Sequence, residues 1–153
     1  MQLVQLPVNI NFKQCKDMEK DHYIGVDISK RTIDIAIYVK SQAKKGTFPH
    51  ETFSNTEEGF KDMKKWLRKQ HVVLSKSLFC MEATGNYTYE LCLFLEQLGV
   101  AYSIQSPLHL KRSFGLTHGK NDKVDASRIA YYAYLHREDI KLSKLASDSV
   151  RKL

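Results

Sequence analysis

The feature that most constrains the fold is a strict alternation of β-branched residues early in the chain. Ile33, Ile35, Ile37 and Val39 alternate with other residues, a pattern typical of a half-buried strand. A shorter apolar run at residues 23–27 precedes it, and a short polar connection at 28–31 joins the two. A turn at 44–46 then leads into a third run that ends near Phe53. The pattern therefore predicts three consecutive strands in an antiparallel meander.

Helical and strand patterns alternate through the rest of the chain. Ser54 and Glu57 have the spacing of a capping box, which predicts a helix over 56–70. Gly99 stands where a helix is expected to end. We expect further elements at 77–82 (strand), 87–98 (helix), 100–104 (strand) and 123–135 (helix), with a loop before the last helix. The order βββαβαβα predicts an α/β fold, a mixed sheet with helices on both faces.

Composition narrows the class of protein. The chain has 153 residues, which fits one domain, and its 24 Lys and Arg against 17 Asp and Glu leave a charge of +7 that attracts polyanions such as nucleic acid. Its three cysteines are odd in number and lack CxxC spacing, which argues against a disulfide framework or a zinc knuckle. No apolar run is long enough to span a membrane, so we expect a soluble cytoplasmic protein and no membrane partner. Residues 1–21 have no clear period and read as an N-terminal leader.

Four acidic residues form the candidate catalytic site. Asp27 and Glu82 each end an apolar strand, where α/β sheets usually bind ligands, and Asp122 and Asp125 are spaced to share one face of the last helix. Carboxylates gathered at one sheet edge repel unless a cation compensates. Hard oxygen ligands suit Mg²⁺ or Mn²⁺, and a pair of such ions supports phosphoryl transfer. Taken singly, each acid is more often a turn former or helix cap; the convergence of four favours a metal site.

Basic residues flank the last two acids. Lys111, Arg112, His118, Lys120, Lys123 and Arg128 could hold a phosphate backbone while the metals act on it. The alternative is a solvated basic face. We therefore predict nucleic-acid contacts at Lys111, Arg112, Lys120, Lys123 and Arg128.

Four stretches resemble the DEDD-type insertion-sequence transposases and the related pilin-gene invertases, whose N-terminal domain is similar to RuvC. They are YIGVDISK around Asp27, SNTEEGF from Ser54, MEATGNY around Glu82 and GKNDKVDA around Asp122 and Asp125. The resemblance runs through most of residues 22–136. It implies a ribonuclease H-like (RuvC-like) fold over 22–140, which has the element order βββαβαβα predicted from the pattern. It also implies that Asp27, Glu82, Asp122 and Asp125 are both the metal ligands and the catalytic residues.

The resemblance also carries expectations about the whole protein. Such transposases continue into a second domain carrying a serine thought to attack DNA, so residues 141–153 are expected to begin a linker helix towards a domain that this chain lacks. The implied activity is metal-dependent cleavage and strand transfer of DNA for a mobile insertion element, with Mg²⁺ or Mn²⁺, two ions, as cofactor. A structured guide RNA serves some members. A homo-oligomer in the full-length protein and a nucleoid-associated bacterial location are further expectations.

Three alternatives stay open. A stand-alone nuclease similar to a Holliday-junction resolvase predicts cleavage by residues 1–153 alone. A non-catalytic nucleic-acid-binding module predicts binding that does not depend on metal or on Asp27. An actin-like or sugar-kinase ATPase is suggested by Gly25, Val26 and Asp27 opening a hairpin, although such phosphate loops usually carry glycine where Ile28 or Ser29 stands.

Overall fold

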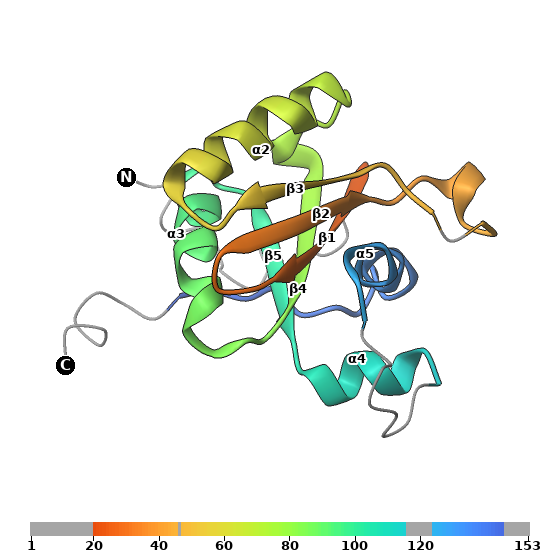
Figure 1. Ribbon diagram of the computed structural model, residues 1–153. Coiled ribbons are helices and arrows are strands. Elements are labelled where there is room, and N and C mark those ends of the chain that lie inside the picture. The colour runs from red at the N-terminus through yellow and green to blue at the C-terminus, as the bar shows by residue number, and fades with distance from the viewer. Residues whose placement is uncertain (1–19, 46, 116–123, 146–153) are drawn as a thin grey trace, which may run out of the picture.

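A five-stranded mixed sheet forms the centre of the molecule (Figure 1). The computed structural model describes residues 20–45, 47–115 and 124–145. The strand order is β3-β2-β1-β4-β5. Strand β1 pairs antiparallel with β2, β2 antiparallel with β3, and β4 parallel with both β1 and β5. The strands are β1 (His22–Ile28), β2 (Thr32–Ile37), β3 (His50–Ser54), β4 (Ser77–Glu82) and β5 (Ala101–Gln105).

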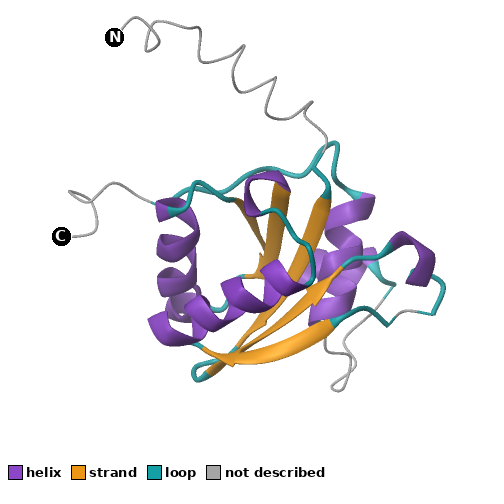
Figure 2. Ribbon diagram, turned by 90° about the horizontal axis from the view of Figure 1, so that it is seen from above, coloured by secondary structure: helices purple, strands orange, loops and turns teal. Residues whose placement is uncertain are grey.

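Helices cover both faces of this sheet, as Figure 2 shows from above. Helices α2 (Glu57–Lys69) and α3 (Tyr89–Gln97) lie on one face, and α5 (Ala126–Leu135) packs on the other with α4 (Pro107–Ser113) beside it. The described residues also contain three short 3-10 helices: η2 (Lys40–Gln42), η3 (Leu74–Lys76) and η4 (Gly85–Thr88). None of the helices in the described ranges is long and apolar enough to cross a membrane.

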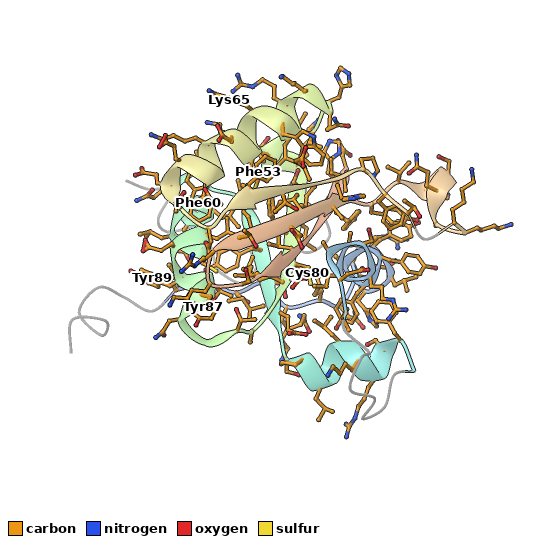
Figure 3. The ribbon with its side chains drawn as sticks, in the orientation of Figure 1. Phe53, Phe60, Lys65, Cys80, Tyr87 and Tyr89 are labelled. Carbon is orange, nitrogen blue, oxygen red and sulfur yellow. The ribbon has the colours of Figure 1, made fainter. Side chains whose placement is uncertain are left out.

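The alternation of side chains along β1 and β4 divides the core into two. Ile24, Val26, Phe79 and Met81 are buried against α2 and α3. Tyr23, Leu78 and Cys80 point the other way and pack with Ile129 and Tyr132 of α5. In Figure 3, Phe60 lies between α2 and the sheet, while Cys80 lies on the side of α5. Successive strand residues face opposite sides, so the position of any residue on these strands decides which helices it meets.

The predicted α/β mixed sheet is confirmed, and the described residues contain one helix that was not expected. We expected a loop between residue 104 and the last helix, but α4 begins at Pro107. Ser106 caps it by accepting a hydrogen bond from the backbone N–H of His109 at 3.1 Å, and Pro107 occupies its first turn. Both are ordinary start signals for a helix. The described helix and strand order is therefore βββαβαβαα.

Two helix boundaries differ from expectation. The N-cap of α2 is Thr56, which accepts from the N–H of Gly59 at 3.1 Å, and not the Ser54 of the predicted capping box. Ser54 is still paired with Thr32 in the sheet, so its backbone belongs to the strand. Helix α3 begins at Tyr89, two residues later than predicted, because η4 precedes it. Its end is as predicted: Gly99 has φ of 71° and closes the helix with the C-terminal hydrogen bonds of a Schellman motif.

The open edge of β5 is covered by residues 141–145. Ser143 donates its N–H to the carbonyl of Tyr102 at 2.8 Å, and its hydroxyl accepts from the N–H of Ile104 at 2.9 Å. The N–H of Leu145 donates to Glu96 on α3 at 2.6 Å. These five residues are not helical; the rest of the linker helix predicted over 141–153, like the leader up to residue 19, lies outside the described residues.

Candidate metal-binding site

Asp27 and Glu82 occupy neighbouring positions on adjacent parallel strands. The paired residues of β1 and β4 end at Val26 and Met81, and the two acids follow directly. Gly25 lies against α5 and Cys80 packs with it. Each acid comes two residues after one of these, and alternate residues of a strand share a face, so both acids face α5 as well. Both acids are half-buried and lie on the α5 face, at the carboxyl ends of their strands. The sheet thus places these two predicted carboxylates together.

They belong to a row of polar side chains with one member from each strand. Asp34 is paired with Asp27, Thr52 with Asp34, and Gln105 with Glu82. Hydrogen bonds hold both ends of this polar row. The hydroxyl of Thr52 donates to Asp34 at 2.6 Å, and that of Tyr132 on α5 donates to the side-chain oxygen of Gln105 at 3.0 Å. The polar row is Thr52, Asp34, Asp27, Glu82 and Gln105.

Asp34 belongs to the polar row beside the candidate site, and it was not predicted from the sequence. It stands directly across from Asp27 in an antiparallel pair, where side chains are close enough for like charges to repel. The signal in the sequence was a polar residue between Ile33 and Ile35 in an alternating strand, a place that usually faces solvent. Only the pairing with β1 reveals that it shares a face with Asp27. The polar row therefore contains three acidic residues on neighbouring strands, although their side chains are not grouped closely enough to hold a metal ion together.

Close contact between α5 and β1 places Asp125 near this edge. A Cβ added to Gly25 would come within 2.0 Å of the Ala126 carbonyl oxygen and 2.3 Å of the Ala130 nitrogen, so only glycine allows the helix backbone to lie this close. Ala126 is the first residue of α5 and Asp125 is its N-cap. The glycine two residues before Asp27 therefore sets the helix start over β1.

Asp125 does not lie within the helix as predicted. The last helix was expected from residue 123, with Asp122 and Asp125 on one of its faces, but it starts at Ala126. The side chain of Asp125 is exposed and its Oδ1 accepts from the N–H of Arg128 at 2.9 Å. Asp122 lies outside the described residues. Within residues 20–45, 47–115 and 124–145, no three His, Cys, Asp or Glu side chains are grouped so that they could hold a metal ion.

Three of the predicted basic residues lie on the helices beside this edge. Lys111 and Arg112 lie in the last turn of α4, and Arg128 lies in the first turn of α5. The two helices meet through Leu110 and Tyr132 in a shared core. Arg112 and Arg128 are exposed. His118, Lys120 and Lys123 lie outside the described residues, and the role of all these residues in binding nucleic acid stays a prediction.

Thiol chemistry at this edge is disfavoured. Cys80 lies two residues before Glu82 on the same face, but it is fully buried, and burial raises the pKa of its thiol to about 12. Burial likewise raises the pKa of Cys92 to about 12. A thiol with such a pKa is protonated at neutral pH and is a poor nucleophile or metal ligand. Both behave as the packed thiols of a core.

Comparisons with known proteins identify the family. A family model for DEDD-type transposases of the IS110 group, described as a transposase, matches residues 24–153. The chain belongs to this transposase family. It is 31% identical to the pilin gene-inverting proteins of Moraxella bovis and Moraxella lacunata over 134 residues, which are 86% of this chain and 39% of each relative. The chain thus spans about two fifths of the length of these curated relatives.

A solved structure confirms the fold of this IS110-type transposase domain. The RuvC structure from Thermus thermophilus is similar with a TM-score of 0.52 at 12% identity, and the match covers 78% of this chain and 98% of that one. The predicted RuvC-like, ribonuclease H-like class is therefore correct. At 12% identity, this similarity supports the fold but not a shared chemistry.

Proposed function

We propose that this chain supplies the metal-dependent catalytic centre with which a transposase cuts and joins DNA strands of a mobile element. The observation that carries the proposal is the placement of Asp27 and Glu82 side by side on parallel strands, facing the helix whose N-cap is Asp125. Membership of the transposase family supplies the substrate class, DNA. Cleavage and strand transfer by the full-length protein are part of the proposal.

The donor set suits divalent cations. Asp27, Glu82 and Asp125, with Asp122, offer carboxylate oxygens, the ligands that Mg²⁺ and Mn²⁺ prefer, and no soft thiolate competes because Cys80 stays protonated. When bound, two such ions polarise the phosphodiester and neutralise the charge that develops on its oxygens.

The chain's own residues would orient the reactants. Repulsion between Asp27 and Asp34 favours occupation of this edge by a cation. The N-terminus of α5 adds the positive end of a helix dipole over β1, next to Asp27. Lys111 and Arg112 of α4 and Arg128 of α5, together with Lys120 and Lys123 outside the described residues, would hold the phosphate backbone. In the full-length protein a homo-oligomer, and for some members a guide RNA, would select the DNA.

The test is divalent-metal binding and metal-dependent DNA cleavage by the intact protein and by three near-isosteric variants. They are Asp27→Asn, Glu82→Gln and Asp125→Asn. Asparagine is also a good N-cap, so Asp125→Asn removes the charge and keeps the start of α5. Asp62→Asn, on the exposed side of α2, is the matched control. We expect each of the three variants to lose Mn²⁺ binding in calorimetry and cleavage of duplex DNA, with the control unchanged. Unchanged binding in all three would disprove the assignment.

A stand-alone resolvase-like nuclease is the second candidate. It is favoured by one observation: the match covers 98% of the RuvC chain, so a domain of this length can be a whole fold of this class. The two candidates differ in what residues 1–153 do alone. A nuclease of this kind cuts branched DNA by itself, whereas the transposase centre needs the rest of its protein for strand transfer.

A further inference from the structure

The stretch from Ser54 to Phe60 joins β3 to α2. Helix capping and core packing account for several of its residues but not for the second one, Asn55. Thr56 caps the helix, and Phe60 is buried in the core. Gly59 packs against the end of β3, where an added Cβ would come within 1.9 Å of the Ser54 carbonyl oxygen. Asn55 takes no part in the cap or in the core. Its two neighbours, Ser54 and Thr56, bond to each other through their hydroxyls at 2.7 Å.

Asn55 makes three hydrogen bonds to two other loops. Its N–H donates to the carbonyl of Arg31 at 2.8 Å, and its side-chain amide donates to the carbonyls of Ser29 and Tyr87, each at 3.0 Å. Both partners of the side chain are carbonyl oxygens, which fixes the nitrogen as the atom that faces them. Ser29 is two residues after Asp27, and Tyr87 is five residues after Glu82. One carboxamide therefore ties together the loops that follow the two acids.

The Asn55 links lie just beyond the last paired residues of β1 and β4. Asp27 is paired outward with Asp34, and Glu82 outward with Gln105, but the paired residues between β1 and β4 end one position before the acids. Beyond Val26 and Met81, the Asn55 side chain links the two halves of the sheet through their loops. Figure 3 shows Tyr87 at the end of the molecule where the turn between β1 and β2 lies.

We infer that Asn55 is a positioning residue for the proposed metal site, holding the strand ends that carry Asp27 and Glu82 at a fixed separation. This rests on the proposed function, because it concerns the same two carboxylates. Partners that orient metal ligands typically change metal affinity by about 10 to 100-fold when they are removed. Loss of both amide donors lets the Ser29 turn and the Tyr87 loop move independently, so the acids no longer meet a cation together.

Asn55→Ala is the test variant, in the intact protein, with Mn²⁺ as the probe in the presence of duplex DNA. Tyr102→Phe is the control, because it also removes a side-chain hydrogen bond, from the Tyr102 hydroxyl to Glu96, but away from the acids. We expect the dissociation constant for Mn²⁺ to rise at least tenfold in Asn55→Ala and to stay at the wild-type value in Tyr102→Phe. Hydrogen exchange should quicken in both residues 28–32 and residues 83–88 of Asn55→Ala only.

The outcomes separate the two ideas. If the wild type binds Mn²⁺ and Asn55→Ala binds it as tightly as Tyr102→Phe does, the role of Asn55 is overturned and the proposed metal site still stands. No Mn²⁺ binding by the wild type overturns the metal site and this inference with it. If Asn55→Ala does not fold, Asn55→Gln decides: it keeps the amide but displaces it by one methylene, and it should weaken Mn²⁺ binding while the protein stays folded.

Discussion

Replacing Gly25 with alanine should be among the most damaging single-methyl changes in this chain. The added Cβ would lie 2.0 Å from the Ala126 carbonyl oxygen, whereas ordinary contact begins at 3.4 Å. Because the opposing atoms are helix backbone, no side chain can rotate away, and α5 must withdraw from β1 by about 1.4 Å. Forcing extra volume into a packed core costs about 1 to 3 kcal/mol. We expect Gly25→Ala to reach about 3 kcal/mol of lost unfolding free energy, at the top of that range.

Urea denaturation followed by circular dichroism measures this loss, with Gly99→Ala as the control. Gly99 has a positive φ of 71° and nothing within 4 Å of an added Cβ, so alanine there meets backbone strain alone, about 1 kcal/mol. If Gly25→Ala is no more destabilised than Gly99→Ala, the close approach of α5 to β1 is wrong. Placement of Asp125 beside the sheet would then lose its support, since it depends on that approach. In a protein that still folds, misplacing a catalytic group by about 1 Å can reduce turnover about 100-fold.

Three further predictions concern the cap, the buried thiol and the missed acid. Thr56→Ala should cost about 1 kcal/mol of stability through loss of the N-cap, and Ser54→Ala less, in thermal melts. Folding raises the pKa of Cys80 from 9.0 to about 12, so the folded state holds this proton more tightly and stability falls as pH rises from 9 towards 12. Cys80→Ala should show a shallower decline in alkaline denaturation. Asp34→Asn keeps an oxygen for Thr52 and removes a charge facing Asp27; it should leave the melting temperature in low salt unchanged or higher, and a clear drop would contradict the repulsion.

The strands could be predicted from the sequence because their signal is local. The alternation of Ile33, Ile35 and Ile37 defines both a strand and its buried face, and an apolar run ending in Glu82 places an acid at a strand tip. The neighbouring placement of Asp27 and Glu82 then followed from the order of the elements. Asp34 could not be found this way, because its face of the sheet becomes part of the site only through pairing with β1.

The helix boundaries show where local patterns compete. Ser54 matches a capping box, but pairing with Thr32 keeps it in the sheet and the cap moves to Thr56. Ser106 and Pro107 signal the start of α4, yet the short helix that follows has one buried residue, Leu110, too few for a helical period. The links from Asn55 span 26 and 32 residues, so they could not be read from local spacing at all.

The polar row across the sheet also bears on how the strands find their partners during folding. Shifting a strand by one residue reverses which face each of its side chains occupies. For β1 such a slip would push Asp27 into the apolar layer under α2 and α3 and turn Ile24 and Val26 towards α5. Burying an unpaired carboxylate among aliphatic side chains is far more costly than losing one backbone pair. The acids proposed to bind metal would therefore also make misregistered sheets less stable than the native one, before any metal or DNA is bound.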